Sequence, residues 1–160
     1  MSSESIEYSI GVLLRQRGLW LAVAESCTGG LIGDRITNIP GSSEYFLGGV
    51  IAYANHVKVN QLGVSPKTLD KHGAVSRETV IEMARGVRQR LGAEIGLSVS
   101  GIAGPGGGTA EKPVGLTWIG LSAAGHEAAW SYRWHGSRIQ VKAQAADQAL
   151  RLLLDYLEQG

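Results

Sequence analysis

The chain has 160 residues, a usual length for one compact domain over residues 1–160, and 44% of them are hydrophobic, which is ample for a core. Its 15 basic and 14 acidic residues give a net charge of +1 without a cluster of cations, so we expect no nucleic-acid partner. One cysteine excludes an internal disulfide and a thiolate metal cage, and no apolar run reaches the ~20 residues that span a bilayer, so we expect a cytoplasmic protein without a membrane segment.

The first part of the chain predicts a helix, a buried strand and a second helix. Apolar residues recur at helical spacing between residues 6 and 14, and Gly18 stands where a helix C-terminal cap belongs. The run "LWLAVA" (19–24) is nearly all apolar, as expected of a strand buried on both faces. Polar residues and glycines at 25–30 then form a corner before the helical pattern that starts at Leu31.

The middle of the chain predicts another strand and further helices. Residues 38–49 are loop-like, because a proline and a glycine break the preceding helix, whereas "VIAYAN" (50–55) predicts a strand that a helical turn follows. Serine caps and closing glycines then mark two helices, at 65–73 and 76–92.

The last part predicts a third strand, a hairpin and a long helix. The strand pattern at 94–100 runs straight into a glycine-rich loop at 101–115. Residues 116–124 and 127–134 resemble the two strands of an antiparallel hairpin, and a C-terminal helix starts near Arg138. Helices that alternate with apolar strands predict an α/β fold, a three-layer α/β/α sandwich around a mixed, mostly parallel sheet.

Two polar, glycine-rich segments, 25–30 and 101–109, each follow an apolar strand. Ligands in open α/β sheets bind beyond the carboxyl ends of the strands, so both segments are candidates for one shared site. The other interpretation is that these glycines only serve tight turns. The Walker phosphate loop, the dinucleotide fingerprint and the HExxH zinc motif are all absent. The four histidines lie in polar or turn surroundings, and we expect none of them to be a catalytic base.

Ser26 is therefore a candidate nucleophile without an obvious histidine partner. A lysine with a depressed pKa can take that role, and Lys58 lies just past the strand predicted at 50–55, with Tyr53 five residues before it. Lysines are usually solvated surface charges, so this pattern is weak by itself. A helix cap is the structural alternative for Ser26.

Two neighbours of Ser26 leave alternatives open. Cys27 would be a rival nucleophile if a helix N-terminus depressed its pKa, but it has no histidine partner, and we favour a small buried core residue. Glu25 is a solvated or turn-capping acid, or else it positions Lys58.

A set of sequence blocks resembles the CinA C-terminal domain family, whose stand-alone members are the PncC-type nicotinamide-nucleotide amidohydrolases. The match covers about residues 5–158, in the order and spacing of the family. The blocks are "AESCTGG", "ITNIPGSSEYFLGGVIAYAN" followed by Lys58, "LGV", "HGAVS", "SGIAGPGGG" and "KPVG". The larger N-terminal domain of the two-domain members is not matched, so the chain resembles the single-domain amidase.

The resemblance implies hydrolysis of nicotinamide mononucleotide to nicotinate mononucleotide and ammonia in pyridine-nucleotide recycling, without a metal or other cofactor. It implies Ser26 as nucleophile, Lys58 as base and Tyr53 as a residue that orients the lysine or relays the proton. The family's threonine is Ser100 here, and Lys142 stands where an arginine is usual, which removes bidentate phosphate pairing. The residues expected to bind substrate are Thr28, Gly29, Gly30, Ser42, Ser43, Ser100, Gly101, Gly104, Gly106, Arg138 and Lys142.

A catalytically silent nucleotide-binding module of the same family is the alternative function, because glycine loops alone would suit it equally. It has no use for Ser26, Tyr53 and Lys58 together, and ammonia release separates the two functions. We also expect a homodimer, with Trp130 and Trp134 as a candidate subunit contact, although core placement suits them equally well.

Overall fold

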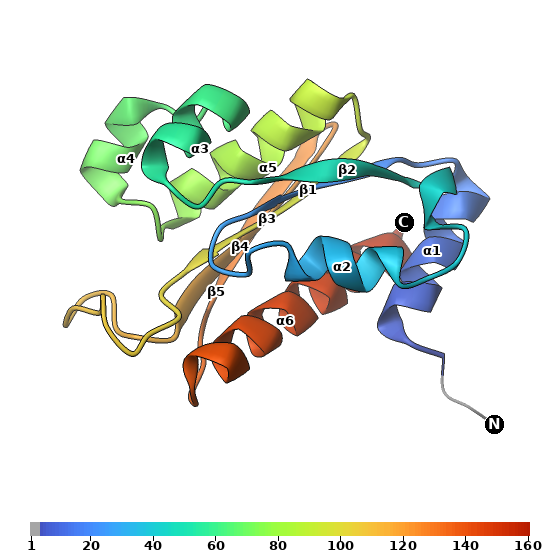
Figure 1. Ribbon diagram of the computed structural model, residues 1–160. Helices are drawn as coiled ribbons and strands as arrows, with labels where there is room; N and C mark the ends of the chain where they lie inside the picture. The colour runs from blue at the N-terminus through green and yellow to red at the C-terminus, as the bar shows by residue number, and fades with distance from the viewer. Residues whose placement is uncertain (1–3) are drawn as a thin grey trace.

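Five strands form one sheet in the order β2-β1-β3-β4-β5, and helices cover both of its faces (Figure 1). The structure, a computed structural model, describes residues 4–160. Its elements are α1 (Ile6–Arg17), β1 (Leu21–Glu25), α2 (Leu31–Thr37), the 3-10 turn η1 (Ser42–Glu44), β2 (Phe46–Ile51), α3 (Asn55–Leu62), α4 (Pro66–His72), α5 (Arg77–Leu91), β3 (Ile95–Gly101), β4 (Leu116–Ala123), β5 (His126–Arg133) and α6 (Arg138–Gln159).

The sheet is mixed, and four of its five strands run in the same direction. β1 pairs in parallel with β2 on one side and with β3 on the other. β4 is antiparallel to β3, and β5 is antiparallel to β4, so only β4 opposes the others. The expected α/β sandwich with a mixed, mostly parallel sheet is confirmed.

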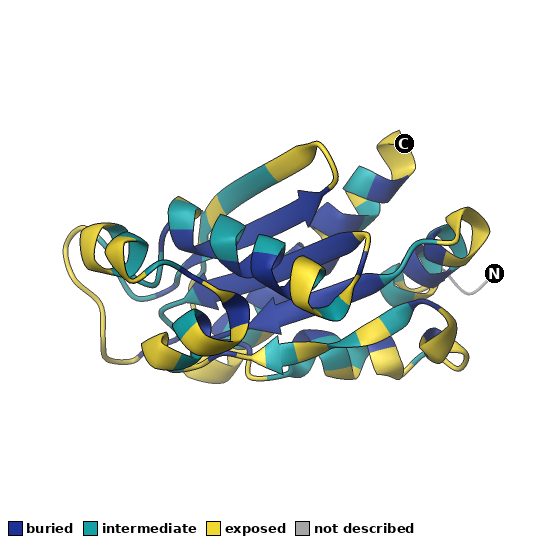
Figure 2. Ribbon diagram, turned by 90° about the horizontal axis from the view of Figure 1, so that it is seen from above, coloured by how far each residue is buried: buried dark blue, intermediate teal, exposed yellow. Residues whose placement is uncertain are grey.

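Two hydrophobic cores fill the space between the sheet and its helices. α1, α2 and α6 cover one face, and α3, α4 and α5 cover the other, as Figure 1 shows. β1 sends Leu21 and Val23 into the first core and Ala22 and Ala24 into the second, because successive side chains of a strand point to opposite faces. All five residues of β1 are buried, and Figure 2 shows the central strands as the buried heart of the molecule. No helix within residues 4–160 is long and apolar enough to cross a membrane.

The predicted helix boundaries are confirmed where capping residues mark them. Gly18 ends α1 in the left-handed conformation, with φ of 64°. The Ser76 hydroxyl accepts a hydrogen bond from the Thr79 amide at the start of α5. At the start of α6, Ser137 and Gln140 form a reciprocal capping box.

The strand predicted at 50–55 is wrong in its position, because β2 occupies Phe46–Ile51 and helix α3 begins at Asn55. The Gly48-Gly49 pair makes this stretch look like a loop in sequence. A Cβ at position 49 would lie 2.6 Å from Cγ2 of Val23, so the glycine lets β2 approach β1 closely. Tertiary packing therefore overrides the low strand propensity of the two glycines.

Helix α5 also depends on a glycine for its close approach to α3. A Cβ at Gly86 would overlap the main-chain oxygen of Leu62, and backbone atoms cannot move aside cheaply. We expect Gly86→Ala to lower the free energy of unfolding by about 1–3 kcal/mol, because overpacking outweighs the helix-propensity gain of about 1 kcal/mol. Urea denaturation measures this loss. The control is Gly106→Ala, where nothing lies within 4 Å, with an expected change within about 0.5 kcal/mol; equal effects of the two variants would contradict the prediction.

Candidate active site

The two glycine-rich segments meet at the carboxyl ends of β1 and β3. Glu25, the last residue of β1, pairs with Ile51 on β2 and with Val99 on β3, so the residues that follow lie at one edge of the sheet. A cavity of about 160 Å³ opens there. It is lined by Ser26, Cys27, Tyr53, Asn55, Lys58, Ala74, Val75, Ser100, Gly101, Ala103 and Arg138. One shared cavity at this edge is what the sequence predicts.

Ser26 and Lys58 are in direct contact in this cavity. Lys58 lies in the first turn of α3 and is 1% exposed. Its Nζ donates to Ser26 Oγ at 3.0 Å and to the main-chain oxygens of Ala52 at 2.8 Å and Tyr53 at 3.0 Å. Three acceptors match the three N–H bonds of an ammonium group, so the amine is held in one orientation.

Burial lowers the pKa of the Lys58 ammonium from 10.5 to about 8, because removal from water disfavours the charged form. A neutral amine has two N–H bonds and one lone pair. If the two carbonyl oxygens of Ala52 and Tyr53 keep the N–H bonds, the lone pair faces the Ser26 hydroxyl. The geometry therefore suits proton transfer from Ser26 to Lys58 near neutral pH.

Of the two alternatives for Glu25, the structure favours the turn-capping acid over an acid that positions Lys58. The residue is 2% exposed, and its carboxylate accepts four hydrogen bonds, from the Thr28 hydroxyl and from the amides of Gly30, Ile32 and Gly33. None of the hydrogen bonds of residues 4–160 joins this carboxylate to Lys58. The carboxylate therefore takes the place of an N-cap side chain, which Gly30 at the N-cap of α2 lacks.

Cys27 is a core residue, as favoured from the sequence. Its side chain belongs to the hydrophobic cluster beneath α6, and burial raises the pKa of the thiol to about 12. A depressed thiol pKa, on which the rival nucleophile hypothesis depends, is therefore wrong for this structure.

Arg138 joins the second glycine-rich segment to the mouth of the cavity. Its guanidinium donates to the Gly104 oxygen at 2.7 Å and to the Tyr53 hydroxyl at 2.9 Å. The Tyr53 hydroxyl thus contacts Arg138, while its main-chain oxygen holds Lys58. This arrangement gives Tyr53 an orienting contact through its backbone and offers no hydrogen bond for a proton relay through its phenol.

Other predicted residues lie around the corner in different roles. Lys142 Nζ lies 3.9 Å from the position of a Cβ built on Gly29, and no hydrogen bond or ion pair within residues 4–160 uses this ammonium. Gly29 and Gly30 have φ of 61° and 108°, a region that side chains rarely adopt, so the turn requires glycine. The Thr28 hydroxyl donates a hydrogen bond to the Glu25 carboxylate, so its hydrogen is already used within the corner. Gly106 lies on the exposed part of the loop and does not line the cavity.

Ser42 and Ser43 are a wrong prediction for this cavity. Both lie in η1, ahead of β2, and the Leu21 amide at the start of β1 donates to the neighbouring Tyr45 oxygen. Ser26 follows the other end of the five-residue strand β1, roughly 17 Å away at 3.3–3.4 Å per residue. The two serines therefore lie at the opposite edge of the sheet from the cavity.

Sequence reasoning did not single out Asn55, Ala74, Val75 and Ala103, which also line the cavity. Ala74 and Val75 belong to "HGAVS", one of the blocks that carry the family resemblance, so the block was a usable signal. Asn55 begins α3, shortly after Ala52 and Tyr53, whose main-chain oxygens accept hydrogen bonds from Lys58 Nζ. Asn55 and Ala103 also lie within such blocks, "ITNIPGSSEYFLGGVIAYAN" and "SGIAGPGGG", so the same signal covered them.

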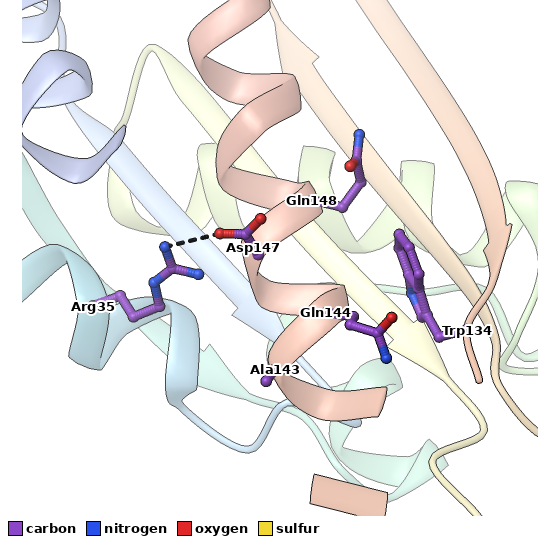
Figure 3. A pocket seen from close by; sticks show the side chains of 6 residues that line it. All are labelled: Arg35, Trp134, Ala143, Gln144, Asp147 and Gln148. Atoms are coloured by element: carbon purple, nitrogen blue, oxygen red, sulfur yellow. Dashed lines mark hydrogen bonds and ion pairs between the residues drawn. The ribbon is translucent and has the colours of Figure 1, made fainter. Parts of the chain in front are cut away.

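A larger groove of about 490 Å³ lies elsewhere, on the outer side of α6 (Figure 3). Its acid Asp147 is already paired with Arg35 at 3.1 Å and with Arg151 at 2.8 Å, and none of its side chains is a serine, cysteine or lysine. Trp134 lines this groove. Both Trp134 and Trp130 pack against the hydrophobic core, so core packing is a sufficient role for these two rings. The smaller cavity is therefore the better candidate for chemistry. Within residues 4–160, no three His, Cys, Asp or Glu residues gather as metal ligands would.

Comparisons with known proteins agree on one family. The family model of the CinA C-terminal domain matches residues 3–157. A relative from Halothermothrix orenii, which carries the name competence-damage inducible protein, is 56% identical over 155 residues. These residues are 96% of this chain and 38% of the relative. A CinA-like protein from Kosmotoga olearia is 49% identical, over 94% of this chain and 36% of its own length. The chain thus spans less than two fifths of these relatives.

Solved structures agree with the fold over nearly all of the chain. A crystal structure of a competence-damaged protein (CinA) superfamily member from Klebsiella pneumoniae is 32% identical, with a TM-score of 0.93 and coverage of 97% of both chains. A competence/damage inducible protein from Agrobacterium tumefaciens is 38% identical, with a TM-score of 0.89 and coverage of 97% of this chain and 98% of that one.

Proposed function

Because the chain belongs to the CinA C-terminal domain family, we propose that its cavity is the active site of an amidohydrolase that converts nicotinamide mononucleotide and water to nicotinate mononucleotide and ammonia. The observation that supports this proposal best is the 3.0 Å contact between Ser26 Oγ and the buried Lys58 amine. A binding module gains nothing from a serine beside a lysine whose pKa is lowered to about 8.

The first half of the reaction uses the serine and the lysine together. Neutral Lys58 takes the proton of the Ser26 hydroxyl while Oγ attacks the carboxamide carbon, and the carbonyl π electrons move to the oxygen. As this tetrahedral intermediate collapses, the C–N bond breaks and the Lys58 ammonium gives its proton to the leaving nitrogen, which departs as ammonia. Ser26 is left as an ester of the nicotinate group.

The second half repeats the same steps with water. Lys58, neutral again, takes a proton from a water molecule that attacks the ester carbon. The C–O bond to Ser26 then breaks, Oγ recovers a proton from Lys58, and nicotinate mononucleotide leaves. Buried Lys58 returns to the state in which it started, so each turnover consumes one water and releases one ammonia.

The shape and charge of the cavity suit one end of this nucleotide. A cavity of about 160 Å³ holds a single ring beside Ser26 and leaves the ribose and phosphate at the mouth. Arg138 lies at this mouth, and Lys142 lies beside Gly29 with its charge unpaired within the described part of the chain. These two cations are the groups we assign to the 5′-phosphate.

A homodimer, expected from the sequence, remains a prediction for solution measurement.

The rate should depend on pH through Lys58. Below about pH 8 the amine carries its extra proton and has no lone pair for Ser26. We therefore expect kcat to rise with pH through an apparent pKa near 8 and to level off above it. Initial rates between pH 6 and 9.5 measure this profile. A rate that falls as the pH rises through 8 would contradict the assignment of Lys58 as base.

Ammonia release from nicotinamide mononucleotide, in the presence of EDTA, tests the proposed function. We expect purified protein to release equal amounts of ammonia and nicotinate mononucleotide. If the nucleotide raises the melting temperature but neither product forms, the chain is a silent binding module and the proposed function is wrong.

A further inference from the structure

We propose that Glu25 is a positioning residue of this site, whose carboxylate shapes the corner after β1 so that the main-chain amides of Cys27 and Thr28 stay free to bind the developing oxyanion. The inference rests on the proposed function, since an oxyanion forms only if Ser26 attacks a carbonyl group. It goes beyond that function because, among the hydrogen bonds of residues 4–160, none joins the Glu25 carboxylate to Ser26 or Lys58.

Most main-chain amides between Ser26 and Gly33 donate a hydrogen bond to an acceptor within the corner or on β3. The Ser26 amide donates to the Val99 oxygen, and the Gly29 and Leu31 amides donate to oxygens of the turn itself. Glu25 Oε1 accepts from the Thr28 hydroxyl at 2.6 Å and from two amides, those of Gly30 at 3.3 Å and Ile32 at 2.9 Å, and Oε2 accepts from the Gly33 amide at 3.0 Å.

Only the amides of Cys27 and Thr28 are left without an acceptor in this corner among the hydrogen bonds of residues 4–160. Cys27 directly follows the proposed nucleophile and lines the cavity. In serine enzymes of other folds, the amide of the residue after the nucleophile is one of the oxyanion donors. The Cys27 amide thus has the place in the sequence that such a site needs, whereas the amides of Gly29 and Gly30 are already used.

A carboxylate is a costly way to cap a helix, which argues for a role beyond capping. The carboxylate of a residue that is 2% exposed must regain through hydrogen bonds what it loses in hydration. A serine or threonine at position 30 would cap α2 locally, but the left-handed turn there, with φ of 108°, requires glycine. Glu25 holds both ends of the turn, through Thr28 on one side and Gly33 on the other, and so fixes the conformation in between.

The test uses acylation of Ser26 by p-nitrophenyl acetate, an activated ester that needs an oxyanion site but no nucleotide. Glu25→Gln keeps the size of the side chain but replaces one acceptor oxygen with an NH₂ group that faces amide donors. We expect the rate of Ser26 acetylation, followed by mass spectrometry with Ser26→Ala as the blank, to fall at least tenfold, since loss of one oxyanion donor elsewhere costs roughly 10²–10³ in rate.

The control is Ser5→Ala, which removes the cap of α1, where the Ser5 hydroxyl accepts from the Tyr8 amide at 3.2 Å, on the far side of the sheet from Lys58. It should lower the melting temperature while leaving acetylation unchanged. If Glu25→Gln behaves like Ser5→Ala, or if Ser26 of the wild type is not acetylated, the proposed positioning role is wrong. Turnover of nicotinamide mononucleotide, measured in parallel, reads the proposed function separately, and Glu25→Gln should lower kcat there with KM changed less than about threefold.

Discussion

Lys58→Met is expected to lower kcat for nicotinamide mononucleotide by about 10³-fold or more. The amine acts as base and then as acid in each half of the reaction, toward Ser26 and the leaving nitrogen and then toward water and Oγ, and general acid–base catalysis contributes roughly 10²–10⁴ in rate. Methionine has a similar length and no titratable group, so it fills the space that Lys58 occupies between Ala52 and Ser26. Steady-state kinetics of the two proteins at pH 8.5 measure the loss.

Lys142→Met is the matched control, because it makes the same change in the lysine beside Gly29, which we assign to the phosphate. Loss of a phosphate contact that is equal in ground and transition states raises KM and leaves kcat nearly unchanged. We expect a KM increase of roughly 10- to 150-fold for Lys142→Met, as one charge-assisted contact is worth about 1.5–3 kcal/mol. If Lys58→Met also changed KM alone, Lys58 would be a binding residue and not the base.

Ser26→Ala is expected to abolish turnover, with a fall in kcat of roughly 10⁴-fold or more, since loss of a serine nucleophile costs up to about 10⁶ elsewhere. The variant should still bind nicotinate mononucleotide, because the two cations assigned to the phosphate, Arg138 and Lys142, are untouched. The expected stability change is small, since Ser26 does not cap α2 and its hydroxyl is hydrogen-bonded only to Lys58 in the described structure. Kinetics and calorimetric titration of the product separate these two effects.

Cys27→Ala makes a neighbouring change of similar size and should keep kcat within about threefold, because burial raises the pKa of this thiol to about 12. The substitution removes a sulfur atom from the core, so it should instead lower the free energy of unfolding by about 1 kcal/mol. Activity that survives in Ser26→Ala but disappears in Cys27→Ala would reverse the two roles.

The sequence predicted the helices, the central strand and the shared cavity because these depend on local signals. Caps such as Ser76 and Ser137 mark helix ends wherever they occur, and the apolar run that became β1 leaves little choice but burial on both faces. Ser26 and Lys58 meet because the carboxyl ends of parallel strands share an edge, so their contact followed once the strands were paired.

The errors lie where packing over a distance decides the structure. The Gly48-Gly49 pair reads as a loop, and only the close contact with Val23 explains why glycines form a strand there. Ser42 and Ser43 were expected in the cavity because residues 38–49 look like a loop in sequence, whereas β2 at 46–51 separates η1 from the carboxyl edge of the sheet. The partners of Glu25 stayed open because its donors come from the three-dimensional shape of the turn.

Whether Ser26, activated by Lys58, attacks the carboxamide is measured most directly by rapid acid quench of the protein during turnover, followed by peptide mapping by mass spectrometry. The result that this account predicts is an ester on Ser26, with the mass of nicotinamide mononucleotide less ammonia, in wild type and in Cys27→Ala but not in Lys58→Met. An adduct on Cys27, or an equal amount of Ser26 ester in Lys58→Met, would contradict it.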